Sequence, residues 1–98
     1  MSDIQIYSPA GIIFGGNKLG VIRDNRIYDP YWNEIGHIEL HGLIHMWGQI
    51  YSNKSGYIGK KQDGYWYDSW GNVVAEEKWS SLHFMDNSNA NHFRNCLF

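Results

Sequence analysis

The sequence predicts an all-β domain built of four antiparallel β-hairpin repeats. The first observation is internal similarity, because four segments of equal length align without gaps. Each begins with a large apolar residue, Tyr, and Ser or Asp, and each ends with an apolar residue followed by Gly or Ala. The second observation is the turn chemistry between the segments, where Asp24-Asn25 and Asp63-Gly64 are typical of two-residue hairpin turns. The four segments are residues 6–15, 27–36, 50–59 and 66–75.

Each repeat unit is interpreted as one β-hairpin. The opening Ile-Tyr or Trp-Tyr pair suits a half-buried strand, and the Ser or Asp that follows can hydrogen-bond the backbone two residues on and begin a turn. A glycine closes the turn in three units, at Gly11, Gly56 and Gly71. The second unit has Trp32 and Asn33 there instead, and we therefore expect its turn to differ. The return strand ends on Gly or Ala, which allows a close approach of neighbouring groups.

A hairpin of this size cannot bury both of its faces and needs its neighbours. Four units either stack as an open solenoid or close into a ring. Because closure removes exposed strand edges, we expect a small closed pinwheel with pseudo-four-fold symmetry. The repeat pattern stops at Trp79. We therefore divide the chain into a four-repeat β domain, residues 1–78, and an irregular C-terminal strap or tail, residues 79–98, which docks on the body or on another subunit.

Length and composition restrict the classes of function. The chain of 98 residues is one small domain, and its 43% hydrophobic content is sufficient for a core. A net charge of -2 argues against general nucleic-acid binding, which needs a basic excess. No apolar run exceeds three residues, so we expect no membrane span, and the N-terminal residues lack the features of a signal peptide. Cys96 is the only cysteine and cannot form an internal disulfide, so we expect a cytoplasmic location.

The pattern of Ile-Tyr-Asp/Ser, turn and Ile-Gly in four copies resembles the four-fold β-flower proteins, small bacterial and phage proteins in which four short hairpins form a pinwheel. The resemblance covers Asp3 to about Glu77. It implies a fold and no established reaction, in a bacterial cell or a phage-infected host.

A second resemblance is local. Residues 63–71 are similar to one unit of the choline-binding repeats of cell-wall proteins, with a Gly-x-Trp-Tyr core and a later Gly. In those modules, aromatic rings from adjacent hairpins cage a quaternary ammonium by cation–π attraction. The resemblance implies such a role for Trp66 and Tyr67, although the first three units carry Ile where the fourth carries Trp.

Aromatic side chains are the predicted ligand-binding residues. In a closed ring, equivalent residues surround the axis, so the repeated tyrosines would converge near one end. The alternative is that each ring packs in the core and hydrogen-bonds through its hydroxyl. Two tryptophans lie in predicted turns, where a large aromatic side chain favours contact with a ligand or partner. The predicted ligand-binding residues are Tyr7, Tyr28, Tyr51, Tyr67, Trp32, Trp66 and Trp70.

Three histidines, His37, His41 and His45, have a spacing that would form a metal-facing stripe on a helix. Glycines interrupt this stretch, and a turn at His41-Gly42 favours a hairpin that pairs Ile38 with His45 and points His37 to the other face. We therefore expect no metal site, and no motif points to another cofactor.

These observations lead us to expect a non-enzymatic binding or interaction protein and a homo-oligomer. It would present aromatic residues to a small molecule, nucleotide-like or sugar-like, or to a protein partner. A host-interaction or anti-defence role, by sequestering a nucleotide signal or blocking a host factor, fits this class. One alternative is a cell-wall carbohydrate- or choline-binding module. The other is a small hydrolase that uses His83 or His92 with Asp86 in acid–base chemistry.

Overall fold

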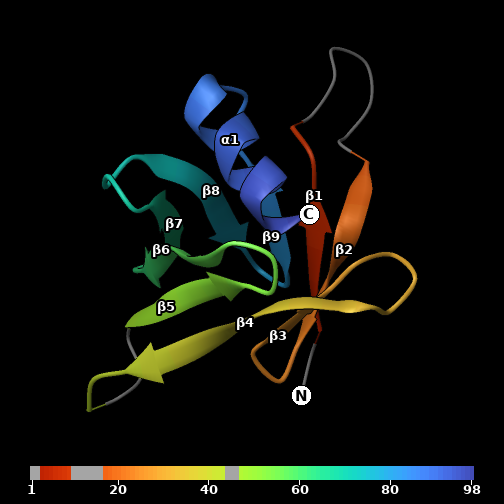
Figure 1. Ribbon diagram of the computed structural model, residues 1–98, viewed down its shortest axis with the longest axis horizontal. Coiled ribbons are helices and arrows are strands. Elements are labelled where there is room, and N and C mark those ends of the chain that lie inside the picture. The colour runs from red at the N-terminus through yellow and green to blue at the C-terminus, as the bar shows by residue number, and fades with distance from the viewer. Residues whose placement is uncertain (1–2, 10–16, 44–46) are drawn as a thin grey trace.

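The computed structural model describes residues 3–9, 17–43 and 47–98. Nine strands form a closed barrel in chain order, and one short helix follows them (Figure 1). The all-β class predicted from the sequence is therefore confirmed, with one helix in addition. The elements are β1 (Ile4–Tyr7), β2 (Lys18–Arg23), β3 (Arg26–Tyr28), β4 (Glu34–His41), β5 (Trp47–Ser52), β6 (Gly56–Gln62), β7 (Tyr65–Asp68), β8 (Val73–Lys78), β9 (Ser81–Phe84) and α1 (Ser88–Leu97).

The segment after Trp79 is ordered, and the prediction of an irregular tail is wrong. Strand β9 pairs antiparallel with β8 and parallel with β1, and thereby closes the barrel. Its alternation buries Leu82 and Phe84 and leaves the residue between them exposed. Helix α1 then begins at the N-cap Asn87, whose side chain accepts a hydrogen bond from the amide of Ala90 at 2.8 Å.

The core of the barrel contains the residue that precedes each repeated tyrosine. All four of these residues are fully buried, and each lies opposite a Gly or Ala on the next strand. The pairing register shifts directly after each of them, which marks a β-bulge at the same place in every unit. The cross-strand pairs are Ile6 with Gly20, Ile27 with Gly36, Ile50 with Gly59, and Trp66 with Ala75.

The first unit is longer than its ungapped alignment predicts. Ile6 pairs with Gly20 rather than with Gly15. Ser8 and Asn17 are joined by two hydrogen bonds, one from each backbone amide, at the base of the connection. The predicted turn residue Gly11 lies outside the described residues. The alignment was wrong here because Gly15 and Gly20 each follow an apolar residue and fit the same short pattern.

The turns of the second and fourth units have the same geometry, so the expectation that Trp32 changes its turn is wrong. In the fourth unit, Asp68 accepts hydrogen bonds from the amides of Trp70 and Asn72, both at 2.9 Å. In the second unit, Asp29 accepts equivalent bonds at 2.8 and 2.9 Å. Trp32 adopts the left-handed conformation, with a φ of 66°. The equivalent residue of the fourth unit is Gly71, with a φ of 87°. The carboxylate cap on the turn stabilises a conformation that is normally unfavourable for tryptophan.

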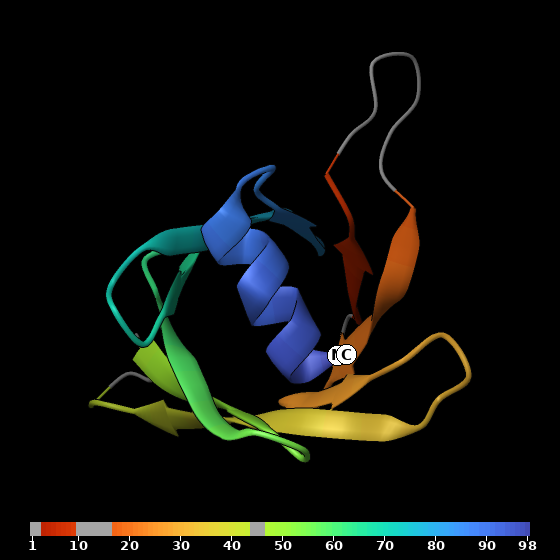
Figure 2. The same cartoon turned by 45° about the horizontal axis from the view of Figure 1, so that its top comes forward.

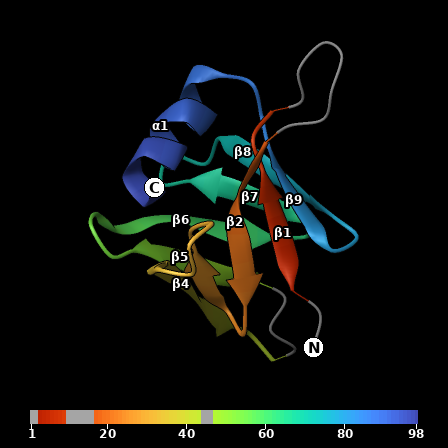
Figure 3. The same ribbon diagram turned by 90° about the vertical axis from the view of Figure 1, so that its right-hand side faces the viewer.

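Helix α1 lies across one end of the barrel, as Figures 2 and 3 show. Its buried side chains, Ala90, Phe93 and Leu97, recur at three- and four-residue spacing and therefore share one face. The Phe93 ring centroid lies 6.0 Å from that of Trp66 in the core. The hydroxyl of Ser52 also donates a hydrogen bond to the Cys96 carbonyl at 2.6 Å. One face of the helix is thus part of the core. Residues on its other faces, such as Asn91, His92 and Asn95, are exposed at this end of the barrel.

Candidate functional site

The four repeated tyrosines lie on the outer face of the barrel, because each follows an inward-facing residue on its strand. The Tyr7 ring stacks on His83 at 5.4 Å and the Tyr51 ring stacks on His37 at 5.1 Å. The Lys60 ammonium lies 5.7 Å from the centroid of a third ring, that of Tyr67. The fourth ring, Tyr28, lies 5.5 Å from Trp32. The structure does not bring these rings together around the axis, where the preceding aliphatic and Trp side chains are packed.

The three predicted tryptophans have different environments. Trp66 is fully buried, and its indole N–H donates a hydrogen bond to Glu77 at 2.9 Å. Trp32 is partly exposed, and the Arg23 guanidinium lies 4.6 Å from its ring centroid. Trp70 is 75% exposed, although the turn that carries it is held by Asp68. Of the three, Trp70 therefore combines a fixed backbone with the largest free ring surface.

The histidines are distributed over several elements. His37 and His41 lie on β4, and His45 lies outside the described residues. Ile38 pairs with Ile50, so the predicted pairing of Ile38 with His45 is wrong. Within residues 3–9, 17–43 and 47–98, no cluster of three His, Cys, Asp or Glu side chains has a geometry suited to a metal ion.

Helix α1 separates two hollows at its end of the barrel. The turn between β5 and β6 contributes to both, since Lys54 lines one and Ser55 lines the other. The first, here called the Lys54 hollow, has a volume of about 510 Å³, and the second, the Trp70 hollow, has about 170 Å³. The Lys54 hollow is lined by Leu19, Lys54, Asn91, Arg94, Asn95 and Phe98. The Trp70 hollow is lined by Ser55, Tyr57, Ile58, Asp68, Ser69, Trp70, His92, Phe93 and Cys96.

The Trp70 hollow has aromatic walls and polar groups at its edge. The Trp70 ring centroid lies 6.2 Å from that of His92, and Tyr57 at the start of β6 is 45% exposed. Asp68 is 6% exposed, and its carboxylate accepts three hydrogen bonds within its own turn. The Cys96 sulfur lies 3.7 Å from the imidazole Nε2 of His92. This arrangement can stack a small ring and hydrogen-bond its edge.

The sequence predicted one residue of this hollow, Trp70. It did not predict Tyr57, His92 or Cys96 as lining residues, because they meet only when α1 packs next to β6 and the turn between β7 and β8. The spacing of His92 and Cys96, four residues apart, was the available signal, but it has meaning only once the segment is known to be helical.

In the described residues, no helix is both long enough and apolar enough to cross a membrane. No protein-family model matches the chain, and no curated protein and no solved structure matches it either.

Proposed function

We propose that this protein is a non-enzymatic binding protein that holds a small, ring-shaped, sugar-like ligand in the Trp70 hollow. The observation that carries the proposal is the exposure of Trp70 on a turn held by hydrogen bonds. Its side chain is 75% exposed, its amide donates a hydrogen bond to Asp68, and it lines a hollow that α1 borders on one side. An exposed indole on a rigid turn gains little from folding and is typical of a contact surface.

The size and chemistry of the hollow favour one neutral ring. Its volume of about 170 Å³ is below the roughly 300–1,000 Å³ of pockets for drug-sized ligands. The rings of Trp70 and Tyr57 offer flat apolar surfaces, and the hydroxyls of Ser55 and Ser69 offer hydrogen bonds. The buried Asp68 carboxylate disfavours a phosphate here, so the nucleotide-like ligand is the weaker candidate for this hollow.

The test is a titration followed by NMR of the tryptophan indole N–H signals, with neutral monosaccharides, choline and AMP as probes. We expect a monosaccharide to shift the Trp70 signal in the wild type and Trp70→Ala to abolish binding. Trp79→Ala is the matched control, since this side chain is 103% exposed and is absent from the lining of the hollow.

Two outcomes would contradict the proposal. One is equal binding by the wild type and Trp70→Ala, and the other is no shift of the Trp70 signal with any sugar. A response to choline instead would favour the cell-wall choline module over the sugar-like ligand.

The pseudo-four-fold arrangement of hairpins belongs to the same proposal. It is supported by the register shift that recurs after each buried residue before a tyrosine. Homo-oligomeric assembly, a protein partner and a cytoplasmic location remain predictions from the sequence. Sedimentation equilibrium of the purified chain tests the first of these.

A further inference from the structure

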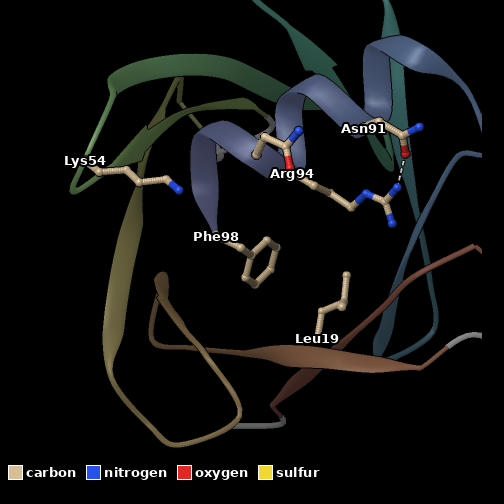
Figure 4. A pocket seen from close by; sticks show the side chains of 6 residues that line it. Leu19, Lys54, Asn91, Arg94 and Phe98 are labelled. Carbon is tan, nitrogen blue, oxygen red and sulfur yellow. Dashed lines mark hydrogen bonds between the residues drawn. The ribbon is translucent and has the colours of Figure 1, made fainter.

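The Lys54 hollow lies on the other side of α1 and shares no lining residue with the Trp70 hollow. It is about three times as large, with about 510 Å³ against about 170 Å³, and lies within the range of small-ligand pockets. Figure 4 shows the Phe98 ring and Leu19 between Lys54 on one side and Arg94 with Asn91 on the other. An apolar surface is therefore bordered by two cations.

The two cations of this hollow have no carboxylate partner in the described residues. The ion pairs formed by arginine and lysine involve Arg23, Arg26, Lys61 and Lys78. Neither Lys54 nor Arg94 is among them, and the segments outside the described residues contain no Asp or Glu. In a chain of net charge -2, two unneutralised cations at one hollow form a local site for an anion.

The chemistry of the two cations suits a phosphate group. Arg94 lies on the helix, where Asn91 accepts a hydrogen bond from its guanidinium. This bond restricts the side chain and leaves further N–H donors free for a ligand. Lys54 lies on the turn between β5 and β6 and offers three N–H donors. A guanidinium fork and an ammonium each bind phosphate oxygens by charge-assisted hydrogen bonds, and here the two groups face the hollow from opposite sides.

The remaining lining residues suit a planar ring. The Phe98 ring is partly buried, and its centroid lies 6.4 Å from that of Phe84, a core residue against which it packs. Leu19 adds an aliphatic surface from β2. The amide groups of Asn91 and Asn95 supply both donors and acceptors, which is the chemistry needed for the edge of a heterocycle or for ribose hydroxyls.

We infer that the Lys54 hollow binds a free nucleoside monophosphate, with its phosphate on Lys54 and Arg94 and its base against Phe98. This ligand differs from the neutral ring assigned to the Trp70 hollow. The two sites contact opposite sides of α1, so each can be removed by mutation without changing the lining of the other.

Isothermal titration calorimetry of the full chain at neutral pH tests the inference, with AMP, adenosine and inorganic phosphate as separate probes. We expect AMP to bind more tightly than either part alone. Lys54→Gln and Arg94→Gln should each weaken AMP binding about tenfold, since each removes a charge-assisted contact. High salt should weaken AMP binding in the wild type by screening the same contacts.

Lys78→Gln is the matched control, because it removes a cation that is paired with Glu76 and is absent from the lining of the hollow. Trp70→Ala should retain AMP binding, which separates this site from the proposed sugar-like site. Binding of AMP that is unchanged in both Lys54→Gln and Arg94→Gln would overturn the inference. So would equal affinities for AMP and adenosine, or no heat with AMP at all, in protein whose circular dichroism matches the wild type.

Discussion

Gly59 and the carbonyl oxygen of Tyr67 lie so close that a Cβ atom at position 59 would be 2.0 Å from that oxygen. The same relationship joins Gly36 to the carbonyl oxygen of Tyr51, at 2.3 Å, and Gly20 to the carbonyl oxygen of Tyr28, at 2.1 Å. The glycine that ends one unit therefore contacts the backbone of the tyrosine that opens the next. This contact explains why glycine ends three of the units, since any side chain there would separate adjacent strands. The fourth unit ends in Ala75, which lies opposite Phe84 of β9 and is followed by no tyrosine.

Gly59→Ala should destabilise the fold by about 3 kcal/mol, because the added methyl group would overlap backbone rather than a side chain that can rotate away. Urea denaturation followed by tryptophan fluorescence measures this change. Gly71→Ala is the matched control, since a Cβ there meets nothing within 4 Å and its φ of 87° is the only penalty. It should cost about 1 kcal/mol. Equal losses in the two variants would contradict the close-contact explanation.

Asp68→Ala should cost about 2–3 kcal/mol, because it removes the acceptor of three hydrogen bonds at a site that is 6% exposed. Asp29→Ala removes the same set of bonds in an exposed turn and should cost about 1 kcal/mol, since water can replace the acceptor. Thermal unfolding of the two variants measures the difference. A larger loss for Asp29→Ala would show that burial does not control the strength of this turn.

The carboxylate of Asp29 should make stability depend on pH in the acid range. Its pKa is lowered from 3.8 by the hydrogen bond from the Asn33 side chain, then by the amides of Asn33 and Tyr31. Because the folded-state pKa lies below the unfolded one, this stabilisation is complete above the unfolded value and is lost as the pH falls through the folded value. The melting temperature of the wild type should therefore approach that of Asp29→Asn as the pH falls below 3.8.

Asn33→Ala tests the cause of that shift. It removes the largest contribution to the lowered pKa of Asp29 and should reduce the acid dependence of the melting temperature. An acid dependence that persists unchanged in Asn33→Ala and in Asp29→Asn would assign it to other carboxyl groups.

Phe93→Ala should destabilise the whole barrel by about 3–5 kcal/mol, because this buried ring packs against both Trp66 and Phe84. Asn87→Ala, which removes the N-cap of the same helix, should cost about 1 kcal/mol. Near-ultraviolet circular dichroism reports on the packing of Trp66, and far-ultraviolet circular dichroism reports on the backbone. Both signals should change in one transition, and separate transitions would show that α1 unfolds independently of the barrel.

Several local features could be predicted from the sequence. The turn after Asp63 and the strands that begin with Ile27, Ile50 and Trp66 depend on residues only a few positions apart. The hydrogen bonds that an Asn amide donates to an Asp carboxylate in the second and fourth units are also local, although the sequence did not predict the positive φ of Trp32. Such features depend on short-range sterics and hydrogen bonding, so a local sequence pattern is sufficient to predict them.

The closure of the barrel could not be predicted in detail. Strand β9 completes it with Leu82 opposite Ile6 and His83 opposite Tyr7, a parallel pairing between the two ends of the chain. In the register with β8, Phe84 lies opposite Ala75, as Asp68 lies opposite Gly59. Strand β9 therefore occupies the place that the first strand of a hairpin unit would take. Its buried positions match those of such a strand, but its sequence lacks the Ile-Tyr or Trp-Tyr pair.

The sequence alone determined the all-β class and the turn chemistry, but it did not determine that the residue before each tyrosine, rather than the tyrosine, faces the core. The tertiary structure decided which strands meet at the seam, where α1 lies, and which side chains line the two hollows. Lys54 and Arg94 are separated by forty positions in the sequence, and Trp70 and His92 by twenty-two. Their proximity results from burying the apolar face of α1 against the barrel, a long-range packing interaction that no local pattern specifies.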